Sequence, residues 1–239
     1  ARLTMSALQL YSGPTALRAL QRDGLQAEQF RMIVGASGGP KWFVLYGLDR
    51  YLFGDFFARS RQPLATLGSS AGAWRLACLG LADPLAGIDR LAWHYSRQTY
   101  SAQPTMHEIS KEARKLVDIV LGASGAAEIA TNSRIGVHIV ADRARGLLRS
   151  DRKPLLLGGL ALCATANTLS RRSLRLSFER ILFHAGAPLS SLTGLQDMPT
   201  RCVQLTEHNV GEALLASGSI PLVMEGVRDI PGAPPGVYR

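Results

Sequence analysis

Residues 64–72 read LATLGSSAG, and this stretch decides the fold that the sequence predicts. The apolar beginning of the stretch is typical of a short strand, its end is a turn of small residues, and residues 73–81 are rich in Ala and Leu, which favours a helix. A strand, a sharp turn with a central serine and a helix together make up a nucleophile elbow. Gly68 and Gly72 have no side chain to hold the strand and the helix apart. Ser70 is therefore the candidate nucleophile.

A second glycine-rich stretch lies upstream, where residues 35–41 read GASGGPK. It follows a strand predicted for residues 30–34, and Pro40 is suited to begin a helix because the first helical turn does not use the missing N–H. Backbone N–H groups at such a helix start bind an anion, either a phosphate or the oxyanion of an acyl intermediate. The glycine spacing fits neither the phosphate loop nor the dinucleotide fingerprint. With a serine elbow downstream, the pattern favours an oxyanion hole formed by Gly38 and Gly39.

Strand-like and helical stretches alternate along the rest of the chain. Strands are predicted for residues 135–141, 180–184 and 202–205, and helices for residues 101–130 and 210–217. This alternation is typical of a layered α/β architecture. The chain has 239 residues, of which 46% are hydrophobic, so residues 1–239 can form one domain with a substantial core.

The chain is basic, with 27 Lys and Arg against 18 Asp and Glu, and a formal net charge of +9. Much of the excess lies in two groups of residues: Arg143, Arg145, Arg149, Arg152 and Lys153, then Arg171, Arg172, Arg175 and Arg180. Basic surfaces attract anions. Because no metal-finger spacing and no interleaved aromatic residues accompany these groups, nucleic acid is not an expected partner. Two interpretations remain, namely solvated basic faces and peripheral association with an anionic membrane surface.

The three cysteines, Cys78, Cys163 and Cys202, show neither a disulfide framework nor a zinc spacing, which predicts a reducing compartment. No secretory signal is recognisable at the start of the sequence. The longest apolar run, residues 154–166, is interrupted by two glycines and is too short to span a bilayer. These features predict a cytoplasmic protein that at most rests on the surface of a membrane.

Three short motifs occur in an order that resembles the patatin-like phospholipases. They are the glycine loop at residues 37–41 (SGGPK), the elbow at residues 68–72 (GSSAG), and residues 214–221 (LLASGSIP), which are similar to the family's Ala-Ser-x-x-x-Pro segment. The resemblance implies a three-layer α/β/α fold with a central, mostly parallel sheet, and a lipid acyl hydrolase (phospholipase or esterase) that needs no metal or organic cofactor. It implies a lipid or other acyl ester as substrate, Gly38 and Gly39 as the oxyanion hole, and Lys41 as a residue that fixes the loop or the headgroup.

The same resemblance implies a Ser–Asp dyad, in which an Asp takes the proton from Ser70 directly. The family places this Asp in an Asp-Gly-Gly or Asp-Gly-Ala turn, and neither occurs in this sequence. Its expected position is just beyond Arg239, a short way after Pro221. The sequence also begins at Ala1 without an initiator Met. We therefore expect a single patatin-like domain that is truncated before the dyad Asp. Asp229 lacks the flanking glycines and is a poor substitute.

Two alternatives remain open at this stage. The first is an esterase of the α/β-hydrolase type, with a triad of Ser70, Asp142 and either His184 or His208 in the chain order of that fold. In this alternative Asp142 stands at the end of a strand, as the acid should. The second alternative is a lipid-binding homologue that has kept the fold without catalysis.

Overall fold

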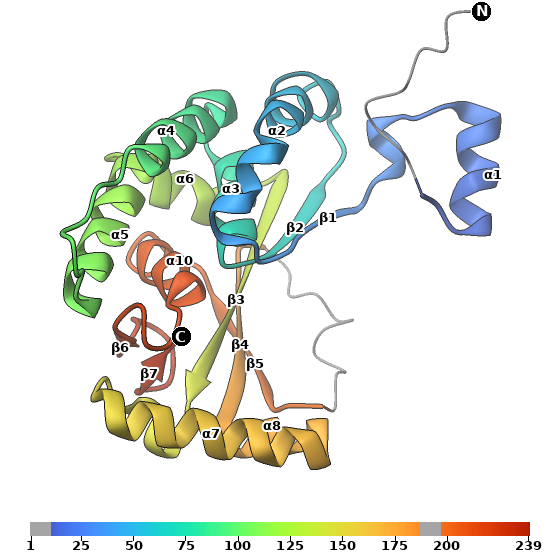
Figure 1. Cartoon of the computed structure of the whole chain (residues 1–239). Coiled ribbons are helices and arrows are strands. Elements are labelled where there is room, and N and C mark those ends of the chain that lie inside the picture. Colours follow the sequence, from blue (N-terminus) through green and yellow to red (C-terminus); the bar gives the residue numbers. More distant parts are fainter. Residues whose placement is uncertain (1–10, 187–196) are drawn as a thin grey trace, which may run out of the picture.

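The computed structural model describes residues 11–186 and 197–239, and its centre is a seven-stranded sheet (Figure 1). The first five strands lie side by side in chain order, and β6 and β7 form a separate pair that joins the sheet through β3. The strands are β1 (Met32–Gly35), β2 (Leu64–Ser69), β3 (Ile135–Ala144), β4 (Phe178–His184), β5 (Thr200–Gln204), β6 (Val227–Arg228) and β7 (Val237–Tyr238).

The main sheet is mostly parallel. β1, β2 and β3 run parallel to one another, as do β4 and β5, while β3 and β4 meet in antiparallel pairing. β3 is the longest strand, and the burial of Ile135, Val137 and Ile139 places it in the core. The α/β class that the sequence predicts, with a mostly parallel central sheet flanked by helices, is confirmed, and the arrangement is compatible with three layers.

Helices cover the sheet and build the walls of the candidate site. α3 packs across β1, β2 and β3, α10 packs on β3 and α5, and α4 packs on α5. α7 and α8 lie across the end of β3 and the start of β4, whereas α1 buries none of its residues and lies apart (Figure 1). The α-helices are α1 (Pro14–Asp23), α2 (Tyr46–Tyr51), α3 (Ala71–Ala77), α4 (Pro84–Ser96), α5 (Met106–Leu121), α6 (Gly125–Thr131), α7 (Lys153–Leu169), α8 (Leu174–Ser177) and α10 (Val210–Gly218).

Two apolar clusters hold these elements together. The main one fills the space between the sheet and α3, α4, α5 and α10, and Leu76, Ile88 and Phe183 are among its most deeply buried members. The smaller one lies beneath α7 and combines Leu148, Leu156 and Cys163 with Ala144 of β3. No helix within residues 11–186 and 197–239 combines the length and apolar character needed to cross a membrane.

Several predicted elements differ in their bounds from the observed ones. The helix predicted for residues 101–130 is two helices, because the chain turns at Gly122 with φ 59° between α5 and α6. The helix predicted to begin at Pro40 starts as a 3₁₀ helix over Gly39–Leu45 and becomes α-helical only at Tyr46. Asp142 lies inside β3 rather than at its end, because pairing with β4 extends the strand to Ala144.

Candidate active site

Ser70 occupies a strained turn between β2 and α3. Its φ of 54° and ψ of −130° lie in a region that residues with a side chain rarely adopt. A Cβ on Gly72 would lie 2.1 Å from the carbonyl oxygen of Gly35, and a Cβ on Gly68 would lie 2.3 Å from Cα of Ala73. The two glycines are thus required for β1, β2 and α3 to approach one another. The turn has the elbow geometry that the sequence predicts.

Ser217, at the end of α10, fastens this turn to the sheet. The backbone N–H of Ser70 donates a hydrogen bond to Oγ of Ser217 at 2.8 Å, and Oγ of Ser217 donates to the carbonyl of Val140 in β3 at 2.6 Å. Sequence reasoning did not assign this role, although Ser217 is the serine of the third motif. That segment is therefore part of the elbow's support.

The glycine loop lies beside the elbow. Oγ of Ser37 donates a hydrogen bond to Oγ of Ser69 at 3.1 Å, and Gly39 has a φ of 50°, a conformation that favours glycine. The N–H groups of Gly38 and Gly39 donate to no other residue within the described part of the chain, and both glycines line a pocket together with Ser70. Two free backbone donors at the nucleophile are what an oxyanion hole requires.

Lys41 is placed differently from these glycines. Its backbone N–H donates to the carbonyl of Gly38 at 3.2 Å, which tightens the loop, but its side chain is exposed. It is not among the residues that line either cavity at Ser70. The structure thus supports a contribution of the Lys41 backbone to the loop and places its ammonium group at the surface.

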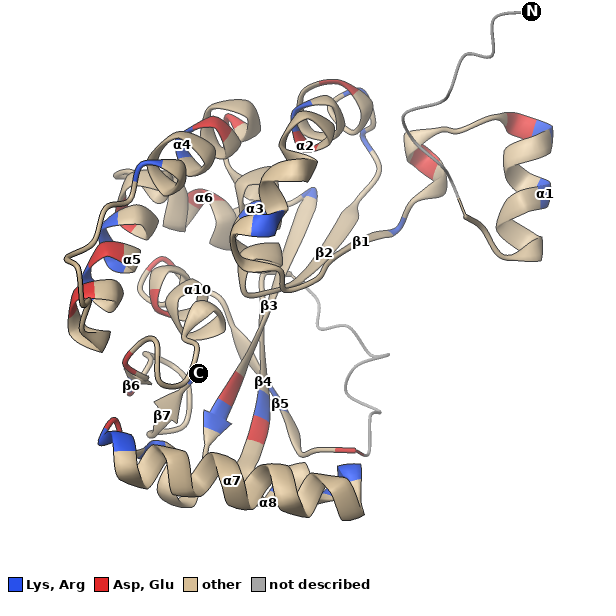
Figure 2. Ribbon diagram, in the orientation of Figure 1, with Lys and Arg blue, Asp and Glu red and all other residues tan. Residues whose placement is uncertain are grey.

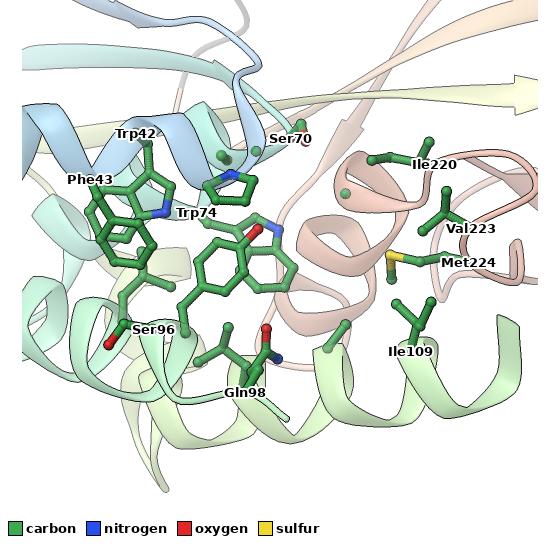
Figure 3. A pocket seen from close by; sticks show the side chains of 18 of the residues that line it. Trp42, Phe43, Ser70, Trp74, Ser96, Gln98, Ile109, Ile220, Val223 and Met224 are labelled. Carbon is green, nitrogen blue, oxygen red and sulfur yellow. The ribbon is translucent and has the colours of Figure 1, made fainter. Parts of the chain in front are cut away.

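An apolar cavity of about 500 Å³ opens on one side of Ser70 (Figure 3). Trp42, Phe43 and Trp74 form one wall, and Ile220, Val223 and Met224 lie across from them (Figure 3). α5 contributes Ile109, Ala113 and Leu116, and α4 contributes Leu91 and Tyr95. The described residues that line the cavity include no Asp, Glu, Lys, Arg or His, and burial raises the pKa of the Tyr95 phenol, so the lining is uncharged at neutral pH. A cavity of this size and polarity suits a hydrocarbon chain.

A smaller and more polar pocket of about 360 Å³ opens on the other side of Ser70. Its lining combines serines and loop glycines with one carboxyl group: Ser37, Gly38, Gly39, Ser69, Ser70, Val140, Ala141, Asp142, Phe178, Ser217, Ser219, Ile220, Pro221 and Arg239. Oδ1 of Asp142 is buried and has no hydrogen-bond partner within the described residues. Burial raises the pKa of Asp142 to about 6, and the nearby Arg180 opposes this rise. Asp142 therefore holds a proton more tightly than an ordinary carboxyl group.

The histidines of the alternative triad lie away from this pocket. His184 pairs across the strands with His138, whereas Asp142 pairs with Arg180, four residues further along β3. The four residues from His138 to Asp142 span about 13 Å of strand, so His184, which lies opposite His138, is far from Asp142. His208 is exposed and lies beside Glu207. The structure thus brings Asp142, but neither histidine, to the pocket of Ser70.

Arg239 is buried beside the polar pocket. Its guanidinium donates to Oδ1 of Asp151 at 2.6 Å and to the carbonyl of Leu148 at 3.1 Å. Its backbone extends the β7 pairing, because Arg239 and Asp142 exchange N–H···O bonds of 2.8 and 2.9 Å. β4 pairs with one edge of β3 from His138 to Ala144. β7 therefore pairs with the other edge of β3, the edge with which β2 pairs as far as Ser69.

The described residues contain no group of three or more His, Cys, Asp or Glu side chains that could hold a metal ion. Cys78 and Cys163 are buried thiols, and burial raises the pKa of Cys78 to about 12. Such a thiol packs as an apolar side chain and is a poor nucleophile at neutral pH. Among the described serines, Ser70 is the one that lines both the apolar cavity and the polar pocket.

Comparison with protein-family models, with curated proteins and with solved structures finds no match to this chain. The resemblance to patatin-like phospholipases accordingly rests on the three sequence motifs alone.

Proposed function

We propose that this chain is a patatin-like acyl hydrolase domain that cleaves an ester bond of a lipid, with Ser70 as the nucleophile. The observation that carries the proposal is the position of Ser70. It sits on a strained elbow at the border between an apolar cavity and a polar pocket, beside the free N–H groups of Gly38 and Gly39. An ester with a long acyl chain fits this division, since the chain enters the apolar cavity and the alcohol side faces the polar pocket.

The reaction follows the covalent logic of serine hydrolases. Oγ of Ser70 attacks the ester carbonyl carbon while its proton passes to a carboxylate base. Gly38 and Gly39 donate hydrogen bonds to the resulting oxyanion. The tetrahedral intermediate collapses, the alcohol leaves with the proton, and an acyl-Ser70 ester remains. Water then attacks this ester, releases the fatty acid and restores the hydroxyl of Ser70.

The base in this proposal is a carboxylate, because no histidine lines either cavity at Ser70 within the described residues. β7 runs antiparallel to β3 with Arg239 opposite Asp142, so a residue that follows Arg239 would come opposite Ala141. Ser69 is opposite Val140, which brings Ala141 level with Ser70. An Asp directly after Arg239 would thus reach the level of the nucleophile, as the dyad requires.

Asp142 is the second candidate for the base, because it lines the same pocket as Ser70. Its raised pKa suits a group that takes up a proton during catalysis near neutral pH. An Asn variant tests this candidate. If Asp142 is the base, Asp142→Asn abolishes turnover while the protein stays folded, and in the dyad Asp142→Asn retains most of the turnover.

Hydrolysis of nitrophenyl esters by the intact gene product tests the proposed function. Wild-type protein should release nitrophenol and Ser70→Ala should not, while both remain folded by circular dichroism. His184→Ala and His208→Ala should keep full activity, and a large loss in either variant would favour the triad. If wild-type protein binds long-chain esters without cleaving them, the chain is a lipid-binding homologue and the proposal fails.

A further inference from the structure

The outward face of α7 carries no charge. Residues 154–170 contain no Asp, Glu, Lys or Arg, although most of them are exposed. The opposite face is buried, with Leu156 and Cys163 packed in the smaller apolar cluster. A surface helix of a globular protein ordinarily has charged residues on the side that faces water. The outward face of α7 is therefore better suited to an apolar neighbour than to solvent.

Four of the exposed residues of α7 are leucines, which lie among small and uncharged polar residues, and a fifth leucine is exposed on α8. The exposed ones are Leu155 (42%), Leu157 (52%), Leu162 (68%) and Leu169 (87%) on α7, and Leu176 (71%) on α8. We call this set the leucine face. Five leucines exposed on adjacent elements form the kind of apolar surface that marks a partner or a membrane.

Basic residues flank the leucine face at both ends. Arg152 and Lys153 lie at the start of α7, and Arg171, Arg172 and Arg175 follow its end, so the helix has positive charge at both of its ends (Figure 2). Residues 152–178 contain no acidic residue. None of the five cations forms an ion pair with any carboxylate of the described residues. The nearby Asp151 is already paired with Arg228 and Arg239.

We propose that the leucine face docks this protein on an anionic lipid surface. The leucines enter the boundary between headgroups and acyl chains, and the flanking cations lie at the level of the lipid phosphates. α7 has 17 residues and lies in the plane of the surface in this arrangement. A second copy is the less suitable occupant, because a symmetric contact would bring two sets of five unpaired cations together.

The buried side of α7, opposite the leucine face, packs close to the neighbourhood of Ser70. Phe178 follows α8 directly and lines the polar pocket of Ser70. Leu222 packs on the cluster beneath α7, and its neighbours Ile220 and Val223 line the apolar cavity. Docking through the leucine face would therefore leave α7, about 10 Å across with its side chains, between the lipid layer and the elements around both cavities. Docking itself does not require hydrolysis, so it does not rest on the proposed function.

Co-sedimentation of the intact gene product with vesicles tests the docking proposal. The vesicles contain phosphatidylcholine alone or phosphatidylcholine mixed with the anionic phosphatidylglycerol. One variant carries Leu157→Gln, Leu162→Gln and Leu169→Gln, and a second carries Arg171→Gln, Arg172→Gln and Arg175→Gln. Matched controls change three exposed residues elsewhere, with Leu17→Gln, Leu25→Gln and Ile119→Gln in one protein and Arg18→Gln, Arg31→Gln and Arg61→Gln in another.

Wild-type protein and both controls should bind the anionic vesicles in preference to the neutral ones. Each docking variant should lose affinity by at least about tenfold, since each basic or apolar contact adds to binding. Ser70→Ala should bind like wild type, and the docking variants should keep wild-type hydrolysis of a soluble ester, which separates docking from catalysis. Unchanged binding of either docking variant would overturn the proposal. So would a dimer that the leucine variant converts to a monomer, because the face would then join two copies.

Discussion

Ser217 is the residue that gives Ser70 a fixed position. Its hydroxyl accepts from the Ser70 backbone and donates to β3, so it links the elbow, α10 and the sheet through one side chain. A strained turn persists only where its surroundings hold it in place. We therefore regard Ser217 as a positioning residue for the nucleophile.

Replacing Ser217 by Ala removes both hydrogen bonds and lets the elbow relax. Ester hydrolysis should lose about 10- to 100-fold in kcat, with little change in KM, because small displacements of a nucleophile are costly. Ser110→Ala is the matched control, because the Ser110 hydroxyl accepts a hydrogen bond from the backbone N–H of Glu225 at 2.9 Å and Ser110 lines neither cavity at Ser70. Both variants should lose about 1–3 kcal/mol of stability. Equal kcat losses in the two would refute the positioning role.

Asp142 should make the stability of the protein depend on pH. Its pKa is raised by burial from 3.8 to about 6, so the folded state holds a proton that the unfolded chain has released in this window. The free energy of unfolding should therefore be highest below pH 3.8, the ordinary pKa of this carboxyl group. It should fall as the pH rises from there towards 6, by up to about 3 kcal/mol. Urea unfolding of Asp142→Asn should lack this decrease. Parallel pH profiles for wild type and variant would contradict the assignment.

At the scale of elements, the site depends on the close approach of β1, β2 and α3. Gly72→Ala puts a Cβ 2.1 Å from the carbonyl oxygen of Gly35, so backbone must move. We expect a loss of about 3 kcal/mol or more, measured by thermal unfolding, together with loss of hydrolysis.

Gly158→Ala is the control for this prediction. Gly158 lies in α7, and a Cβ there meets nothing within 4 Å. This variant should gain about 0.5–1 kcal/mol, because alanine favours a helix over glycine. Equal stability of Gly72→Ala and Gly158→Ala would show that β1 and α3 do not approach each other as closely as the structure places them.

The elements around Ser70 could be predicted from sequence because their signals are local. The apolar residues of β2, the small residues of the turn and the glycines upstream each follow from neighbouring residues alone. The return of β7 to β3 could not be predicted, since Val237 and Tyr238 carry no sign of the strand they join. The separation of His184 from Asp142 likewise depends on the register between β3 and β4, two strands that are far apart in the sequence. The sequence marks residues 154–166 as apolar without indicating which of them are buried, and only the structure places Leu155, Leu157 and Leu162 at the surface.

At the scale of the whole molecule, Ser70 lies between two cavities that suit the two sides of a lipid ester. The apolar one is built from α3, α4, α5 and the loop after α10, elements that come together only in the folded chain. Its volume should therefore limit the acyl chain that the enzyme accepts.

Filling the cavity should shorten the preferred chain. Ile109 lies on α5 and lines the apolar cavity (Figure 3), so Ile109→Trp takes up part of its space. We expect kcat/KM for long-chain esters to fall about tenfold while short-chain esters are unaffected. Ile119→Trp, on the exposed side of the same helix, should leave both unchanged. Equal losses for short and long chains would mean that acyl chains bind elsewhere.

The central claim is that Ser70 is an activated nucleophile, and covalent labelling tests it most directly. The intact gene product is treated with a fluorophosphonate probe, digested and analysed by mass spectrometry. We predict one adduct, on the peptide that contains Ser70, and none in Ser70→Ala. A folded wild-type protein that takes up no probe, or that takes it up equally when Ser70 is replaced, would contradict the account.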